Sequence, residues 1–378
     1  MPLIYVIAGE QSGDALGARL MHAMKAVRPD LRFAGIGGAG MAAEGLESLF
    51  PMHDLAVGGL VEVLPKVFLL RRRIHETVAD IASRRPDVVV TIDAQGFAVR
   101  VLRRIAGLGL KRAHYVAPQV WAWREHRVKH YPGLWDSLLC LLPFEPPYFA
   151  KHGLPGIFVG HPVLESGADT GNGPAFRARH GIAPEALVLT VMPGSRRAEV
   201  AKLLPTLGET LLRLPAGVIP VVPLAGPVAE AVRAGTEAWP VRPILVTDIA
   251  EKFDAFAASN AALTKSGTST LELAMAGVPM VVTYRINPIT AWIVRRTLKV
   301  KWASLLNLLA GREVIPELIQ EDCTPDKLAT VLRTLLTDAA AGPAQVAGYR
   351  PMLDALRPPA GLPSEAAAAA VLGLLPAC

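Results

Sequence analysis

The sequence predicts an α/β protein of two doubly wound, Rossmann-like halves, each a parallel sheet with helices on both faces. Short apolar strands, such as residues 87–92, alternate with helical segments along the chain. Continuously apolar strands of this kind lie inside parallel sheets. The strand series stops near residue 162 and begins again at Leu187. The length of 378 residues is enough for two domains.

The predicted strands divide the chain into two halves joined by a linker. The first half is expected at residues 1–164, with a helix over about 14–27 and strands at residues 3–8, 33–36, 87–92, 114–117, 137–142 and 156–159. A segment rich in Gly, Asp and Pro, residues 165–174, is the expected linker. The second half is expected at residues 175–344, with strands at residues 187–192, 218–224, 244–246, 260–264 and 278–284. Ligands of doubly wound sheets bind at the carboxyl ends of the strands, so we expect the site in a cleft between the two sets of strand ends.

Composition narrows the classes of partner. Hydrophobic residues make up 51% of the chain and the net charge is +6, which favours a basic surface facing phosphates or anionic lipid. Aromatic residues are few and basic runs short, which argues against a nucleic-acid partner. No stretch reaches the ~20 apolar residues that span a bilayer, and the N-terminus lacks the features of a signal peptide, so we expect a cytoplasmic protein. The cysteines, Cys140, Cys323 and Cys378, have no metal-ligand spacing, and we expect neither a metal nor a cofactor.

A small-residue turn in the second half is the first candidate site. Ser266, Gly267 and Thr268 join a predicted strand to a predicted helix. Backbone amides at such a helix N-terminus suit a phosphate. Glu272 lies at the same end of the helix and can accept both hydroxyls of a ribose, as acidic residues do in other nucleotide sites. The alternative is an ordinary turn followed by a helix with a capping box that Glu272 completes.

The first strand of the second half leads into another candidate. Gly194 permits a tight turn, Ser195 can cap the next helix, and Arg196 can meet phosphate oxygens with a two-point fork. The alternative is a capped helix that begins with a solvated pair of arginines, Arg196 and Arg197.

Acidic residues follow strands of the first half. Asp93 ends a strand, where a carboxylate can take a proton from an attacking hydroxyl. The alternative is a turn-forming aspartate that holds the backbone amides after it. Glu10, Ser12 and Asp14 stand at the matching end of the first strand. This loop lacks the lysine of a P-loop, which argues against an ATPase. Its glycines lack the spacing of a dinucleotide fingerprint, which argues against a dehydrogenase.

Two basic amphipathic stretches are candidates for membrane contact. Residues 60–73 and 292–302 place aliphatic and aromatic side chains beside Lys and Arg. Such a pattern suits an interfacial helix on anionic lipid. An amphipathic core helix with a basic outer face explains each stretch separately. Their joint presence favours lipid contact for at least one, and the first is the better candidate.

A series of short blocks resembles the lipid-A-disaccharide synthase family. The blocks follow the family's order from residue 4 to about 340 and lie at residues 8–14, 115–124, 142–145, 159–162, 193–196, 266–268, 279–282 and 307–312. The resemblance implies a GT-B fold and an inverting transferase that acts without a metal. It implies that UDP-2,3-diacylglucosamine and 2,3-diacylglucosamine 1-phosphate become a β-1,6-linked disaccharide phosphate and UDP.

The resemblance also implies roles for particular residues. Asp93 becomes the base for the acceptor 6-hydroxyl, and Arg196 and Asn307 complete the catalytic set. The UDP-sugar is expected at Gly194, Ser195, Arg196, Ser266, Gly267, Thr268, Glu272, Arg285 and Asn307. The acceptor side is expected at Glu10, Ser12, Gly13, Asp14, Gln119 and Trp121.

The sequence departs from the family pattern in two places. Many members follow the base with Pro-Asp-Phe, whereas this chain has Gln95, Gly96 and Phe97, so a second carboxylate is absent. Leu306 stands where a proline is usual. Residues 345–378 are expected to return to the first domain, as the family's last helix does.

We expect the protein at the inner face of the cytoplasmic membrane. The apolar C-terminal tail is compatible with a homodimer. Two alternatives stay open. A UDP-sugar epimerase on the same fold would convert the donor without an acceptor. A non-catalytic, lipid-associated protein would bind the UDP-sugar and release no UDP.

Overall fold

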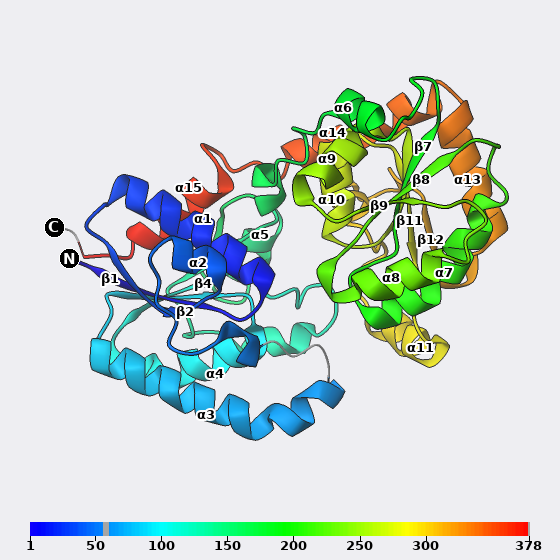
Figure 1. Cartoon of the computed structure of the whole chain (residues 1–378). Helices are drawn as coiled ribbons and strands as arrows, with labels where there is room; N and C mark the ends of the chain where they lie inside the picture. The colour runs from blue at the N-terminus through cyan, green and yellow to red at the C-terminus, as the bar shows by residue number, and fades with distance from the viewer. Residues whose placement is uncertain (56–59, 377–378) are drawn as a thin grey trace. The chain divides into compact units, whose positions relative to one another are not determined.

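The computed structural model describes residues 1–55 and 60–376, apart from the side chains of residues 60–66 and of Ile289. The chain forms two units, Met1–Pro162 with Leu356–Cys378, and Val163–Ala355. Each unit is a six-stranded sheet in which every pair of neighbouring strands is parallel. Helices cover both faces of each sheet (Figure 1), which confirms the predicted fold class.

The first unit has the strand order β2-β1-β3-β4-β5-β6. Its strands are β1 (Leu3–Ala8), β2 (Arg32–Ile36), β3 (Val88–Ile92), β4 (Lys111–Tyr115), β5 (Ser137–Cys140) and β6 (Gly156–Phe158). One face of the sheet carries α1 (Gln11–Val27), α2 (Ala39–Ala43) and α15 (Pro363–Leu372) (Figure 1). The other face carries α3 (Leu60–Arg84) and α4 (Gln95–Ile105), and α5 (Glu145–Ala150) precedes β6.

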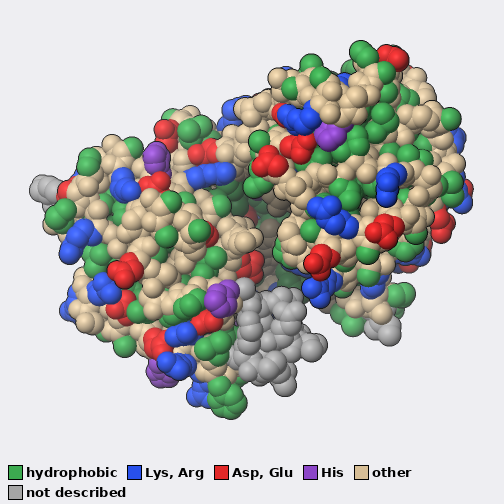
Figure 2. All heavy atoms as spheres, in the orientation of Figure 1, with side chains coloured by type: hydrophobic (Ala, Val, Ile, Leu, Met, Phe, Trp, Pro, Cys, Tyr) green, Lys and Arg blue, Asp and Glu red, His purple; other side chains and the backbone are tan. Residues whose placement is uncertain are grey.

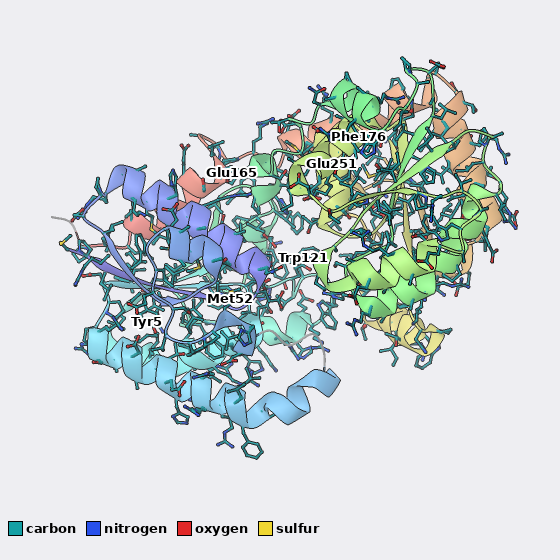
Figure 3. The ribbon with its side chains drawn as sticks, viewed as in Figure 1. Tyr5, Met52, Trp121, Glu165, Phe176 and Glu251 are labelled. Carbon is teal, nitrogen blue, oxygen red and sulfur yellow. The ribbon has the colours of Figure 1, made fainter. Side chains whose placement is uncertain are left out.

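Helices bury both faces of this sheet, which explains why its strands are apolar throughout. Tyr5 and Ile7 of β1 belong to the core beneath α3 and α4, whereas Ile4 and Val6 belong to the core beneath α1 and α15. Neighbouring side chains of a strand point to opposite faces, so a strand covered on both sides must be apolar throughout. Tyr5, labelled in Figure 3, also donates its hydroxyl to Asp80 of α3 at 2.8 Å.

The second unit has the strand order β12-β11-β10-β7-β8-β9. Its strands are β7 (Val188–Met192), β8 (Ile219–Pro223), β9 (Ile244–Val246), β10 (Ala261–Lys265), β11 (Met280–Tyr284) and β12 (Glu317–Ile319). One core lies beneath α7 (Arg197–Leu211), α8 (Ala229–Thr236) and α13 (Pro325–Thr337). The remaining helices are α6 (Gly173–Arg179), α9 (Ile249–Ala258), α10 (Thr268–Met275), α11 (Pro288–Thr297), α12 (Leu305–Ala310) and α14 (Ala341–Asp354).

Several boundaries differ from those that the sequence predicts. The strand expected at residues 114–117 is β4, which ends at Tyr115 because the next residue, Val116, has φ of +74°. The helix predicted to follow the turn at Ser266, Gly267 and Thr268 is α10, which already includes Thr268 and begins directly after Gly267. Strand β12 was not predicted, since its three residues are only partly buried.

The C-terminal segment contributes to both units. Helix α14 belongs to the second unit, and the chain joins the first unit again from Leu356 onward. There α15 packs on α1 and extends the core that α1 covers.

Among the described residues, no helix has both the length and the apolar character that a bilayer crossing requires. In the view of Figure 2, acidic and basic side chains are interspersed over the visible surface of each unit.

Candidate active site

Each sheet has one point at which the strand order reverses. In the first unit β1 pairs with β2 on one side and with β3 on the other, so the reversal lies between β1 and β3. In the second unit it lies between β7 and β10. Ligands of doubly wound sheets bind at the carboxyl ends of such strands. The predicted residues Glu10 and Asp93 follow the first pair of strands, and Arg196 and Ser266 follow the second pair.

Asp93 stands on the wall of a cavity of about 600 Å³ within the first unit. Glu10 lines the same cavity, together with apolar and basic side chains from α3 and α4. Burial raises the pKa of the Asp93 carboxyl, and a backbone hydrogen bond from Ala94 opposes this rise only in part. A carboxylate with a raised pKa is a better proton acceptor near neutral pH. Asp93 also borders a neighbouring cavity of about 310 Å³, which Gln119 lines.

The backbone around Asp93 is strained. Asp93 and Ala94 have φ values of +48° and +42°, and Val116 has +74°. Left-handed backbone is uncommon outside glycine and is unfavourable for a β-branched residue. Asp93 lines both cavities, Ala94 lines the larger one and Val116 the smaller one. Such strain tends to gather at functional sites, where the surrounding structure maintains it.

A close approach of two loops fixes this geometry. A Cβ atom at Gly9, which follows β1, would lie 2.8 Å from the Cβ of Ala94. Only a glycine lets the loop after β1 pack against the loop that carries Asp93. The amide of Asp93 donates to the carbonyl of Tyr115 at 2.9 Å, which ties the same loop to β4.

The residues after β1 have different surroundings. Asp14 is buried, and its carboxylate accepts the amides of Gly38, Gly40 and Met41 at 2.7 to 3.0 Å. It therefore holds the start of α2 in place. Gly13 is buried, whereas Ser12 and Glu10 are exposed.

Trp121 lies on the loop after β4 (Figure 3) and is anchored there by its neighbours. Its ring packs edge-on against Phe144 at 4.9 Å, and its Nε1 donates to Glu145 at 3.1 Å. Glu145 also accepts the amides of Leu141 and Leu142, and burial raises its pKa to about 7. In the sequence, the only signal for Glu145 is its place in the block at residues 142–145.

In the second unit a buried carboxylate organises the loop after β7. Glu199 of α7 is almost fully buried and lies 3.4 Å from the cationic nitrogens of both Arg196 and Lys265. The hydroxyl of Tyr284 donates to it at 3.3 Å. Gly194 has φ of +119°, and a Cβ there would lie 2.9 Å from a Glu199 oxygen, so glycine is required. Neither Glu199 nor Lys265 is predicted as a site residue from the sequence.

The turn after β10 presents the start of α10. Ser266 donates its hydroxyl to the carbonyl of Ala303 at 2.7 Å and its amide to that of Thr283 at 3.2 Å, so both donors serve the structure. Gly267 is the N-cap of α10 and offers no side-chain cap. The first amides of a helix lack a partner four residues earlier, so those of Thr268 and Ser269 can bind an anion, whereas the amide of Thr270 donates to the carbonyl of Gly267 at 3.1 Å. Lys265 adds positive charge directly before this turn.

Two other residues predicted to bind the UDP-sugar, Glu272 and Arg285, already contact side chains of the protein. Glu272 forms an ion pair with Lys252 of α9, whose nitrogen lies 3.1 Å from both carboxylate oxygens. Arg285 follows β11 and reaches the hydroxyl of Thr206 on α7 at 3.4 Å. A ribose at Glu272 would therefore share the carboxylate with Lys252.

Asn307 is fully buried and uses both ends of its amide. Its nitrogen donates to the Ile315 carbonyl and to Glu317, each at 2.8 Å. Its oxygen accepts the amides of Val314 and Ile315. Glu317 also accepts the amide of Ala303, the residue whose carbonyl Ser266 contacts. In this arrangement Asn307 positions the loop beside the Ser266 turn.

Replacing Asn307 by alanine is expected to lower the free energy of unfolding by about 3 kcal/mol, because buried backbone groups lose their partners. Denaturant unfolding of the full chain measures this change. Arg312→Ala serves as the control, since Arg312 belongs to the same sequence block and is exposed. Equal stability of the two variants would contradict the positioning role of Asn307.

The family comparison decides between the candidate classes of protein. The family model described as lipid-A-disaccharide synthetase matches residues 4–371. The chain belongs to the lipid-A-disaccharide synthase family. A lipid-A-disaccharide synthase of Granulibacter bethesdensis is 57% identical over 388 residues, which cover 99% of each chain. The lipid-A-disaccharide synthase of Gluconobacter oxydans is 56% identical over 376 residues, which cover 99% of this chain and 91% of the relative.

Solved structures of low sequence identity share the fold of this chain. The glycotransferase of kitacinnamycin has a TM-score of 0.64 at 18% identity, with 99% of each chain covered. The UDP-GlcNAc 2-epimerase of Neisseria meningitidis has a TM-score of 0.61 at 12% identity, with 99% of each chain covered. The predicted GT-B fold is confirmed. Because a transferase and an epimerase share it, family membership and not the fold disfavours the epimerase alternative.

Proposed function

We propose that the chain transfers 2,3-diacylglucosamine from UDP-2,3-diacylglucosamine to the 6-hydroxyl of 2,3-diacylglucosamine 1-phosphate. The products are the β-1,6-linked disaccharide 1-phosphate and UDP. Family membership supports the reaction as a whole. We assign the acceptor to the first unit and the UDP-sugar to the second. This division is supported by the position of Asp93 at the reversal point of the first sheet and of Arg196 and the α10 N-terminus at that of the second.

In this proposal Asp93 is the base of a single displacement. The donor sugar is α-linked and the product β-linked, so the acceptor oxygen attacks the anomeric carbon from the face opposite UDP. The new carbon–oxygen bond forms while the bond to the diphosphate breaks, and UDP leaves with the electron pair. The acceptor proton passes to the Asp93 carboxylate, whose raised pKa suits this task.

The second unit stabilises the leaving diphosphate in the same proposal. The amides at the start of α10 and the cations of Arg196 and Lys265 offset the charge that develops on UDP. Glu199 orients both cations by its contacts at 3.4 Å. Glu272 accepts the ribose hydroxyls and keeps its ion pair with Lys252.

A UDP-release assay tests the reaction. Purified protein receives the acylated UDP-sugar with and without the acyl-glucosamine phosphate, and UDP and lipid products are measured. We expect UDP only when the acceptor is present, in equal amount to the disaccharide. Conversion of the donor without acceptor would indicate an epimerase, and binding of the donor without UDP release would indicate a binding protein.

We further propose that the protein associates peripherally with the inner face of the cytoplasmic membrane through α3. Phe68 of α3 is 81% exposed and stands beside the basic residue Arg71, which suits an anionic lipid surface. Residues 60–66 of the predicted stretch have side chains outside the described part. The second stretch, on α11, exposes Trp292, with the Arg296 guanidinium 3.7 Å from its ring centre. The homodimer stays a prediction.

Replacing Phe68 by serine is expected to reduce flotation with anionic liposomes several-fold, because an exposed aromatic residue is lost from the lipid-facing helix. Trp292→Ser tests the second stretch in the same assay. Val27→Ser is the control, since Val27 is exposed at the end of α1, outside both stretches. Unchanged flotation of Phe68→Ser together with a loss in Trp292→Ser would move the contact to α11.

A further inference from the structure

The cavity that holds Asp93 combines an apolar wall with a group of arginines. Its apolar wall comprises Leu55, Val67, Leu70, Ile74 and Phe97. Arg71 of α3 and Arg100 and Arg104 of α4 line the same cavity. We call these three residues the cavity arginines. A base, an apolar wall and guanidinium groups therefore surround one space of about 600 Å³, a volume typical of ligand sites.

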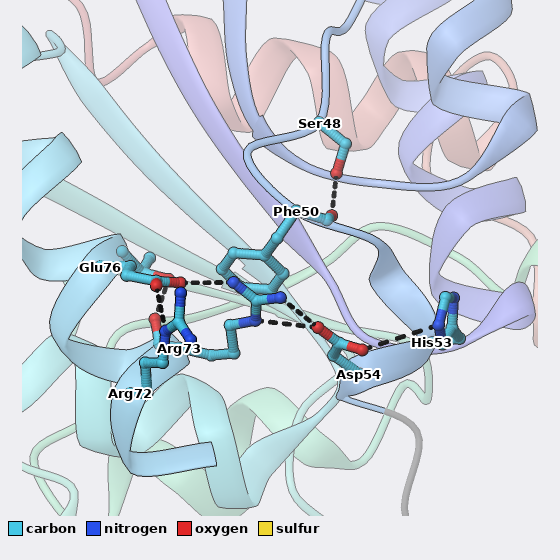
Figure 4. Close-up of polar contacts among 8 residues, drawn as sticks. Ser48, Phe50, His53, Asp54, Arg72, Arg73 and Glu76 are labelled. Atoms are coloured by element: carbon cyan, nitrogen blue, oxygen red, sulfur yellow. Dashed lines mark hydrogen bonds and ion pairs between the residues drawn. The ribbon is translucent and has the colours of Figure 1, made fainter. Parts of the chain in front are cut away.

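The cavity arginines differ from their neighbours in their partners. Arg72 pairs with Glu76 at 2.7 Å, and Arg73 pairs with Asp54 and Glu76, each at 2.6 Å (Figure 4). Farther along α3, Arg84 pairs with Asp80 at 2.8 Å. These pairs neutralise Arg72, Arg73 and Arg84, which lie outside the cavity.

Within the described part of the chain, none of the cavity arginines forms an ion pair with a carboxylate. Arg100 donates to the carbonyl of Gly96, four residues earlier. Glu10 lies on the cavity wall as well and contributes a negative charge.

Two of the cavity arginines lie close together on α4. Arg100 and Arg104 are exposed and lie one turn apart on the same helix face, where like charges destabilise a helix slightly and a bound anion would relieve the repulsion. Arg71 comes from α3, which packs against α4. Basic residues near a helix C-terminus also favour the helix dipole, but Arg103 gains the same benefit outside the cavity. The dipole thus does not explain why three arginines border one cavity.

We propose that the cavity arginines bind the 1-phosphate of the acceptor and that the apolar wall receives one of its acyl chains. This inference rests on the proposed function and names the residues that select a phosphorylated acceptor. Guanidinium groups match phosphate oxygens with paired hydrogen bonds. The phosphate fixes the orientation of the sugar, and its 6-hydroxyl is held at Asp93 on the wall of the same cavity.

The test compares two acceptors, 2,3-diacylglucosamine 1-phosphate and the same acyl sugar without the phosphate. The full chain is assayed as wild type, as the double variant Arg100→Ala with Arg104→Ala, and as the control Arg103→Ala. Arg103 neighbours Arg104 at the end of α4 but does not line the cavity. The measured quantity is the ratio of kcat/KM for the phosphorylated acceptor to kcat/KM for the phosphate-free acceptor.

We expect this ratio to be about 10–100 in wild type and in Arg103→Ala, and to approach 1 in the double variant, as the loss of charged hydrogen bonds implies. The KM for the UDP-sugar should not change. An unchanged ratio in the double variant, or an equal loss in Arg103→Ala, would overturn the inference.

A binding measurement separates this inference from the proposed function. Titration calorimetry with both acyl sugars reports the preference for phosphate without any transfer. If wild type forms no disaccharide, the proposed function fails. If wild type forms the disaccharide but the double variant still binds the phosphorylated sugar more tightly, the role of the cavity arginines is wrong and the proposed function stands.

Discussion

Replacement of Asp93 by asparagine is expected to lower kcat by about 10³-fold, the usual effect of a general base. The amide has nearly the same shape as the carboxylate but cannot accept the acceptor proton. Affinity for UDP, measured by titration calorimetry, should stay that of wild type, because the proposed nucleotide site lies in the second unit. Burial raises the pKa of Asp93, so the acidic limb of the wild-type pH profile should lie above the usual range of an aspartate.

The control for this variant is Asp30→Asn, which removes an exposed carboxylate that pairs with Arg28 in the same unit. It should keep wild-type turnover. A thermal unfolding curve of Asp93→Asn checks that the fold persists. Near-normal turnover of a folded Asp93→Asn protein would exclude Asp93 as the base and leave the acceptor side of the mechanism without its proton acceptor.

Replacing Arg196 by alanine is expected to lower kcat by about 10²-fold or more, the effect of removing one preorganised group that stabilises a developing charge. The Arg196 side chain is 75% exposed and contacts Glu199 at 3.4 Å, so it can reach a ligand without breaking a buried network. UDP affinity should fall as well, because the guanidinium meets the diphosphate in the ground state. Steady-state kinetics and UDP titration measure the two effects.

Arg197→Ala is the matched control for Arg196. Arg197 is the next residue, is also exposed, and lines a separate cavity between α7 and α8. Both variants lose one positive charge from the same helix start, so a general electrostatic effect would weaken them equally. Similar kinetic losses in both would contradict a specific contact between Arg196 and the diphosphate.

Most strands were predictable from the sequence, and the residues singled out as candidate sites follow four of them. Buried strands such as β3 are apolar on both faces, and this pattern is visible without a structure. The residues that follow β1, β3, β7 and β10 were singled out before the strand order was known. The order then placed them at the two reversal points, since the carboxyl ends of neighbouring parallel strands lie at one edge of a sheet.

Other features depend on contacts between residues distant in sequence. The positive φ values of Asp93 and Val116 leave no mark in residue type, because neither is glycine. Glu199 resembles an ordinary first-turn acid until Lys265 and Tyr284 are seen beside it. The catalytic role of Asn307 stays a prediction, and the four hydrogen bonds of its side-chain amide, which hold the loop at residues 314–317, could not be foreseen from the sequence.

The central claim is that the diphosphate binds where β7 and β10 end, against Arg196 and the first turn of α10. A crystal structure of the full chain soaked with UDP tests this most directly. We expect the diphosphate at the amides after Gly267 and the ribose at Glu272, with the Arg196 guanidinium turned toward the phosphates. A nucleotide bound elsewhere in the protein would contradict the assignment of the donor site and the roles derived from it.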